Sequence, residues 1–201
     1  TFDNFDKICV SFSGGKDSTC MTHMVLDEAI KRGRKVALLF IDWEIQYKMT
    51  IDHVKHVFEM YKDYIIPYWI ALPLLTDNAC SQFEPEWICW DKDKKDAWVR
   101  QPDELSITDE SYFPFYYYKI TFEEFVPKFA EWFGEGQISA CMIGIRTRES
   151  LNRWRALTNQ HKNVFADKLF TTCVSDNVYN VYPIYDWRAE DDWTYLGKFH
   201  K

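Results

Sequence analysis

The sequence of 201 residues lacks the long apolar runs and targeting segments that mark membrane and secreted proteins. No apolar stretch approaches the roughly 20 residues that a membrane-spanning helix requires. The first residues, Thr1-Phe-Asp-Asn-Phe-Asp, do not have the basic and apolar regions of a signal peptide. These absences predict a cytoplasmic protein without a membrane segment.

Closely spaced cysteines are also missing, because none of the six forms a CxxC pair. A chain of this length without a secretory signal is not expected to depend on disulfides. A four-cysteine metal site is disfavoured too, since its ligands normally come in close pairs. The cysteines are Cys9, Cys20, Cys80, Cys89, Cys141 and Cys173.

An excess of positive charge is likewise absent, and the formal net charge is -7. A general electrostatic attraction to nucleic acid is therefore not expected, although a basic groove within an acidic protein stays open. The hydrophobic content of 47% is enough for a sizeable core, and the length suits one domain over residues 1–201.

Apolar runs and helical patterns alternate through the first third of the chain. Continuous apolar runs at 8–12, 35–41 and 65–72 predict strands that are buried on both faces. Apolar residues at helical spacing predict helices over 18–32 and 49–61. This alternation is typical of a parallel sheet covered by helices.

The rest of the chain divides into an insertion and a return to the same pattern. Residues 73–120 are rich in Trp, Asp, Lys and Pro, which favours an irregular aromatic insertion that serves as a lid or a partner surface. We expect a helix over 121–133, a strand over 138–145 and the start of a helix at Ala189. Because that helix has barely begun at Lys201, we expect a continuation of the chain to be missing. The predicted fold is α/β and Rossmann-like, with a mostly parallel five-stranded sheet and helices on both faces.

The segment Ser13-Gly-Gly-Lys-Asp-Ser18 follows the first expected strand, at an end where parallel sheets bind ligands. The adjacent Gly14 and Gly15 permit a tight backbone in which successive N–H groups converge on one anion. The helix that follows adds unpaired N–H donors and the positive end of its dipole, and Lys16 adds a charge. Phosphate or pyrophosphate uses all of these groups at once, together with the hydroxyls of Ser11, Ser13 and Ser18.

The same segment is neither a Walker A loop nor a dinucleotide-binding loop. A Walker A loop requires glycine where this chain has Val10, and Ser or Thr where it has Asp17. The alternative to an anion site is an ordinary glycine turn in which Asp17 or Ser18 caps the helix.

The segment Ser13–Ser18 resembles the PP-loop of the adenine-nucleotide alpha-hydrolase superfamily. Within that superfamily the chain most resembles the phosphoadenylyl-sulfate (PAPS) reductase family. Three further stretches carry this resemblance: Leu39-Phe-Ile-Asp-Trp-Glu44, Gly144-Ile-Arg-Thr-Arg-Glu-Ser150 and Pro183-Ile-Tyr-Asp-Trp-Arg-Ala-Glu-Asp-Asp-Trp193. The stretch that begins at Asp42 is also similar to a phage and mobile-element subgroup found beside a ParB-like partner.

Four arginines crowd the segment after the 138–145 strand, namely Arg146, Arg148, Arg153 and Arg155. The planar guanidinium group pairs with two oxygens of a phosphate or sulfate, so the first two arginines favour anion binding. Ion pairs with Glu149 are the competing interpretation, because residues three and four apart share a helix face. The resemblance implies that Gly144, Arg146 and Arg148 face the phosphates or the sulfo group of a nucleotide.

Two acids near these segments are candidate Mg²⁺ ligands, Asp17 and Asp42, since carboxylates suit this ion. Asp17 equally suits a helix cap, and Asp42 a solvated strand end. The resemblance implies that Leu39, Phe40 and Ile41 lie near the adenine base. The candidate catalytic residues are Lys16, Asp17 and Arg146.

Sulfonucleotide reductases carry a Glu-Cys-Gly-x-His segment, and this sequence has none, nor the clustered cysteines of their iron–sulfur forms. No iron–sulfur cluster is expected.

One hypothesis is an enzyme that binds ATP and cleaves it between the alpha and beta phosphates. A second is reduction or sulfo transfer on PAPS, assisted by a partner or a missing tail. A third is a nucleotide-gated interaction module with a DNA-associated, ParB-like partner. Oligomerisation stays open.

Overall fold

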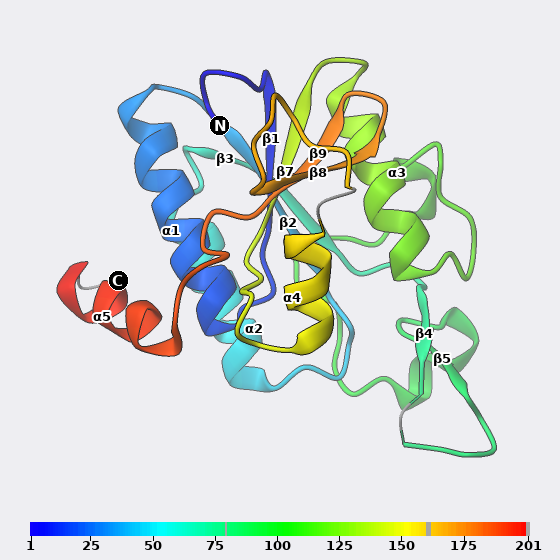
Figure 1. The fold of residues 1–201 in the computed structure, drawn as a ribbon. Helices are drawn as coiled ribbons and strands as arrows, with labels where there is room; N and C mark the ends of the chain where they lie inside the picture. Colours follow the sequence, from blue (N-terminus) through cyan, green and yellow to red (C-terminus); the bar gives the residue numbers. More distant parts are fainter. Residues whose placement is uncertain (79, 160–161, 200–201) are drawn as a thin grey trace.

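The computed structural model describes residues 1–78, 80–159 and 162–199, and it is an α/β fold (Figure 1). Its central sheet has seven strands in the order β6-β3-β2-β1-β7-β9-β8, and only β8 runs antiparallel to its neighbour. The strands are β1 (Lys7–Ser11), β2 (Val36–Ile41), β3 (Ile65–Ile70), β6 (Ser106–Ile107), β7 (Ser139–Ile143), β8 (Thr171–Ser175) and β9 (Val178–Val181).

Helices cover both faces of this sheet. The helices are α1 (Lys16–Lys31), α2 (Lys48–Met60), α3 (Phe122–Gly134), α4 (Leu151–Thr158) and α5 (Ala189–Phe199). Side chains alternate along each strand, so Val10 packs with α1 and α2 while Cys9 packs with α3. The α/β class and the mostly parallel sheet agree with the sequence prediction.

The predicted number of strands was wrong, because the central sheet has seven strands and not five. The additional pairs involve β6, which has two residues, and the hairpin of β8 and β9. These strands are short and partly exposed, so they lack the apolar runs that identify β1, β2 and β7. The last helix was also underestimated, since α5 continues for 11 residues.

Residues 73–120, which we call the insertion, are largely irregular but have an ordered framework. It contains a small antiparallel hairpin, β4 (Leu75–Asp77) with β5 (Glu86–Ile88), and two short 3-10 helices (Lys92–Ala97 and Glu110–Tyr112). The hairpin projects from the body of the molecule (Figure 1). Trp90 and Phe113 are buried against the α3 side of the sheet, so part of the insertion belongs to the core.

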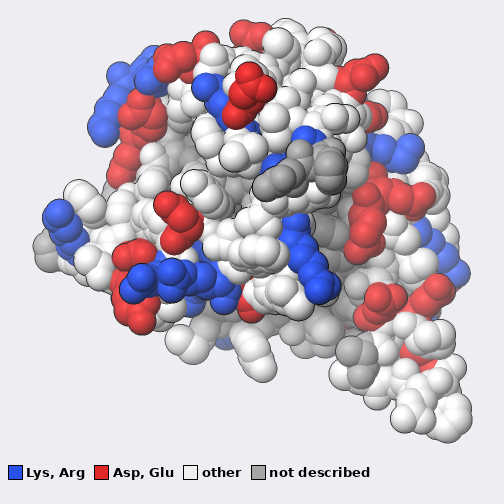
Figure 2. All heavy atoms as spheres, viewed as in Figure 1, with Lys and Arg blue, Asp and Glu red and all other residues white. Residues whose placement is uncertain are grey.

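Within the described ranges, no helix is both long enough and apolar enough to cross a membrane. Figure 2 shows acidic and basic side chains interspersed over the visible face, with many acids on the side of α3 and the insertion.

Candidate phosphate-binding site

The loop between β1 and α1 turns back on itself through two serines and a glycine. The backbone N–H of Ser13 donates to Ser18 Oγ at 3.2 Å, and the two hydroxyls lie 2.9 Å apart. Gly14 has φ +76, and a Cβ atom there would lie 2.8 Å from Thr50 Cγ2. A side chain is therefore excluded at Gly14 by both backbone conformation and space.

The first turn of α1 has no side-chain cap, although α3 and α4 are capped by Thr121 and Ser150. The N-cap residue is Gly15, and the alternative that Asp17 or Ser18 caps the helix does not hold. The Ser18 hydroxyl instead donates to the Gly15 carbonyl oxygen at 3.0 Å. The backbone N–H groups of the first helical turn thus lack intrahelical partners and face the loop.

The tip of β7 packs against this same helical turn. Gly144 lies so close to α1 that a Cβ atom would be 3.1 Å from Ser18 Cα and 3.2 Å from Ser18 N. The glycine-arginine segment recognised in the sequence therefore meets the PP-loop, although the two are far apart in the chain.

Four charged side chains meet beside the loop: Lys16, Asp17, Arg146 and Asp192. The Lys16 ammonium pairs with Asp17, and it donates to Asp192 Oδ2 at 3.1 Å. Arg146 Nε lies 3.0 Å from Asp17 Oδ1, and its Nη2 donates to Asp17 Oδ2 at 3.2 Å. The three candidate catalytic residues are thus brought together, with Asp192 as a fourth member.

The charge cluster shifts the pKa values of its acids in opposite directions. Burial would raise the pKa of Asp17, but contacts with Asp192, Lys16 and Arg146 outweigh burial and lower it. Burial and the neighbouring Asp17 raise the pKa of Asp192 to about 6. Burial likewise opposes the charge of Lys16, but its hydrogen bonds to the two aspartates raise its pKa.

Asp192 was missed as a site residue in the sequence. The stretch Pro183–Trp193 was recognised only as the start of a helix, and its three consecutive acidic residues suit any helix N-terminus. In the structure Asp192 is fully buried, whereas Asp191 is exposed at the surface. A helical projection from Ala189 would have singled out an acid on the inner face of α5.

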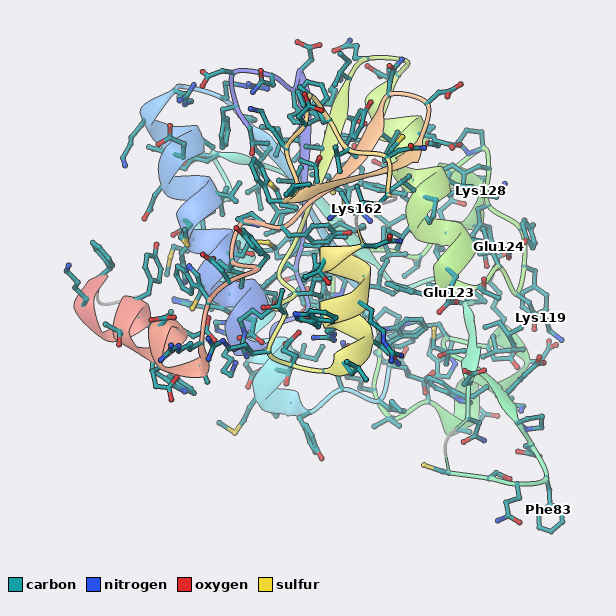
Figure 3. All side chains as sticks on the ribbon, viewed as in Figure 1. Phe83, Lys119, Glu123, Glu124, Lys128 and Lys162 are labelled. Atoms are coloured by element: carbon teal, nitrogen blue, oxygen red, sulfur yellow. The ribbon has the colours of Figure 1, made fainter. Side chains whose placement is uncertain are left out.

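A cavity of about 640 Å³ opens directly over the loop. One wall has apolar residues from α3 and β7, including Phe122, Val126 and Ile143. Glu123 also lines the cavity, and it lies at the N-terminal end of α3 (Figure 3). The cavity is also lined by seven of the candidate nucleotide-binding residues, namely Ser11, Ser13, Gly15, Lys16, Asp17, Ser18 and Gly144.

The remaining arginines lie outside the charge cluster. Arg148 is exposed and does not line the cavity, so the structure does not bring it to the loop. Arg153 lines the cavity but pairs with Glu149, which is the internal ion pair considered in the sequence. Of the four arginines, Arg146 alone is in contact with the residues of the PP-loop.

The residues expected near adenine belong to the core. Leu39 and Phe40 are buried, and Ile41 is 8% exposed. None of the three lines the cavity. The apolar part of the cavity is instead formed by α3 and the end of β7.

Asp42 is a structural anchor for the insertion. Its side chain is fully buried, accepts the indole N–H of Trp69 at 2.9 Å and pairs with Arg100. Its backbone oxygen accepts the indole N–H of Trp90 at 2.6 Å. With both carboxylate oxygens engaged by protein donors, neither the proposed metal contact nor a solvated strand end describes this residue.

The acids present do not fit a preformed Mg²⁺ site. Both carboxylate oxygens of Asp17 already face the cations Lys16 and Arg146, and Asp42 is occupied as described. Among residues 1–78, 80–159 and 162–199, no group of three or more His, Cys, Asp or Glu could hold a metal ion. We therefore derive no step through a metal held by these residues.

Cys20 is the thiol nearest to the loop, and its environment does not suit nucleophilic attack. It is fully buried, and its Sγ donates to the backbone oxygen of Asp192 at 3.5 Å. Burial raises its pKa to about 12, so the reactive thiolate is scarce at neutral pH.

Residues 7–71 match the family model of the phosphoadenosine phosphosulfate reductase domain. The chain is 48% identical over 200 residues to the "Uncharacterized protein YbdN" of Escherichia coli (strain K12). That match covers 98% of this chain and 49% of the relative, so the chain spans about half the length of the curated relative it matches. A crystal structure of PAPS reductase from Candida auris in a phosphate complex superposes with a TM-score of 0.52 at 18% identity, covering 100% of this chain and 76% of the other.

The chain therefore has a Rossmann-like α/β fold that it shares with this PAPS reductase, and the loop Ser13–Ser18 follows its first strand. The family match lies within residues 7–71, which include β1, the loop, α1, β2, α2 and β3. The chain is similar to the PAPS reductase family over these residues, as its motifs indicated.

Proposed function

We propose that the chain binds an adenine nucleotide through its phosphates and catalyses nucleotidyl transfer with release of pyrophosphate. The observation that carries this proposal is that the uncapped N-terminus of α1 and the cation Lys16 line one cavity. The tight turn at Gly14 and the guanidinium of Arg146, which pairs with Asp17, adjoin them outside the lining.

The proposed reaction needs no protein nucleophile. An acceptor oxygen forms a bond to the alpha phosphorus while the bond to the bridging oxygen breaks, and that oxygen leaves with the electron pair as pyrophosphate. The loop amides, Lys16 and Arg146 would neutralise the charge that accumulates on the leaving group. The apolar wall with Phe122, Val126 and Ile143 supports placing the base between α3 and β7 rather than on β2.

The test is incubation with ATP, Mg²⁺ and a panel of candidate acceptors, followed by separation of the nucleotide products. AMP or an adenylated acceptor together with pyrophosphate is the expected result. The Lys16→Met variant is the matched negative control. Formation of ADP and phosphate, or no turnover with any acceptor, would count against nucleotidyl transfer.

A sulfonucleotide is the second candidate ligand, because residues 7–71 match the PAPS reductase domain family. Reduction would then require a thiol that reaches the ligand, which a partner or additional chain could supply, since Cys20 is buried. Comparing affinities for 3'-phosphoadenosine 5'-phosphate and AMP tests this candidate. Equal affinities would remove its support.

The projecting hairpin supports a third role as a nucleotide-gated interaction module. Phe83 is 95% exposed and lies at the tip of the projection (Figure 3). The ParB-like partner and the phage or mobile-element subgroup stay predictions from the resemblance. A pull-down from the native host with wild type and Phe83→Ser, each with and without ATP, tests this role. Recovery of the same proteins by both variants would contradict it.

A further inference from the structure

Asp192 joins the last described helix to the PP-loop. It is fully buried, and its Oδ2 accepts from Lys16 Nζ at 3.1 Å, across a separation of 176 residues. Helix α5 packs against α1 at this point. The contact therefore ties α5 to the lysine on which phosphate binding is proposed to depend.

Two cations and one other acid surround Asp192. Lys16 and Asp17 face it from α1, and Arg146 Nε approaches its Oδ2 at 3.7 Å from the segment after β7. The other carboxylate oxygen, Oδ1, is buried and has no hydrogen-bond partner in the part of the chain that the structure describes. Both cations are thus paired with carboxylates in the free protein, and Glu149 lies 3.9 Å from Arg146 as a third acid.

A phosphate that enters the loop must compete for the same lysine. Lys16 is partly exposed and lines the cavity, whereas Asp192 is inaccessible to solvent. The ammonium group can turn toward the cavity, but Asp192 cannot turn toward water. Withdrawing a cation from a buried carboxylate is unfavourable, and this cost opposes anion binding.

We propose that Asp192 is a positioning residue that holds Lys16 against α5 in the free protein and thereby lowers the affinity of the loop for phosphate. Binding then requires Lys16 to exchange the Asp192 carboxylate for a phosphate oxygen. This inference rests on the proposed function of the loop and adds a residue that sets its affinity. Asp192 is not in the cavity lining, so it acts through Lys16 and not on the ligand.

A purely structural role for Asp192 is the alternative, in which the ion pair only anchors α5. Asp192→Asn distinguishes the two roles, because it keeps the size and one oxygen acceptor but removes the negative charge. If Asp192 competes for Lys16, the affinity for pyrophosphate should rise about tenfold, equivalent to about 1.4 kcal/mol. An anchoring role would lower the melting temperature and leave the affinity unchanged.

The experiment measures pyrophosphate binding by calorimetry at pH 7.5 for wild type, Asp192→Asn, Lys16→Met and the double variant. Asp191→Asn is the matched control, because it removes the neighbouring charge, which accepts from the backbone N–H of Arg188 outside the cluster. We expect tighter binding in Asp192→Asn alone, and no difference between Lys16→Met and the double variant.

The outcomes separate this inference from the proposed function. If wild type binds pyrophosphate and Asp192→Asn binds it equally or more weakly, the inference is overturned while the phosphate site stands. A gain that persists in the Lys16→Met background also overturns it, because the effect would not pass through the lysine. If neither wild type nor Asp192→Asn binds pyrophosphate or ATP, the proposed function itself is wrong.

Discussion

Gly144 at the tip of β7 lies against Ser18 of α1 so closely that a Cβ atom would be 3.1 Å from Ser18 Cα. The obstacle is backbone, which cannot move aside as a flexible side chain can. This close approach lies at the carboxyl edge of the sheet, next to the Arg146–Asp17 ion pair, and it limits how far the first turn of α1 can move toward β7.

Gly144→Ala should therefore displace the first turn of α1 and weaken nucleotide binding at least severalfold, with a lower melting temperature. Gly197→Ala is the matched control, since a Cβ at Gly197 meets nothing within 4 Å and alanine favours a helix. Titration with ATP and thermal unfolding of both variants check this. Unchanged affinity in Gly144→Ala would contradict the role of this contact.

Gly14→Ala should abolish phosphate binding, because it should disrupt the tight turn of the loop at this residue. It combines a left-handed φ of +76 with a clash against Thr50 Cγ2 at 2.8 Å. Gly33 also has a left-handed backbone, with φ +61, but an added Cβ atom would meet nothing within 4 Å. Gly33→Ala therefore measures the cost of the backbone conformation alone, which is about 1 kcal/mol. We expect a larger loss of stability in Gly14→Ala, measured by denaturant unfolding. Equal losses would mean that the contact with α2 is unimportant.

Lys16→Met should weaken ATP binding by about 2 kcal/mol, or roughly 30-fold, because it removes a charged hydrogen bond to phosphate. Lys48→Met removes an exposed lysine, paired with Asp52 on α2, and should change the affinity little. Calorimetric titration of the two variants makes the comparison. Similar affinities would exclude Lys16 as a ligand of the phosphates.

Asp42→Asn should destabilise the fold by about 3 to 5 kcal/mol, because it breaks a buried ion pair with Arg100 and a hydrogen bond from Trp69. Asp52→Asn, in an exposed pair, should cost less than about 1 kcal/mol. Urea unfolding measures both. A normal stability combined with a loss of Mg²⁺-dependent binding would favour the metal role instead.

The contribution of Asp192 to the free energy of unfolding should decrease as the pH rises from about 4 to about 6. An aspartate in the unfolded chain has a pKa near 4, whereas that of buried Asp192 is raised to about 6. Ionisation therefore disfavours the folded state over this interval. The lowered pKa of Asp17 acts with the opposite sign and at lower pH. Melting temperatures of wild type and Asp192→Asn from pH 4 to pH 7 should diverge in favour of the variant, and parallel curves would contradict the prediction.

The local pattern of apolar residues was sufficient to predict the strand and the helix that flank the loop Ser13–Ser18. Strand β2 is buried at every position, so its continuous apolar run was visible in the sequence, as was the helical spacing of α1. Strands β8 and β9 are partly exposed and mix polar with apolar residues, and they were missed for that reason. Their place in the sheet depends on pairing with β7, which is a long-range contact.

The sequence by itself determined that a glycine-rich loop follows a buried strand and precedes a helix, because strand burial and backbone freedom are local properties of the residues. Only the tertiary structure decided which side chains share the space around that loop. In that structure Asp192 accepts a hydrogen bond from Lys16, and Asp42 accepts one from Trp69 and pairs with Arg100. The physical reason is that the energy of a buried charge depends on neighbours from distant segments, and no local pattern specifies those neighbours.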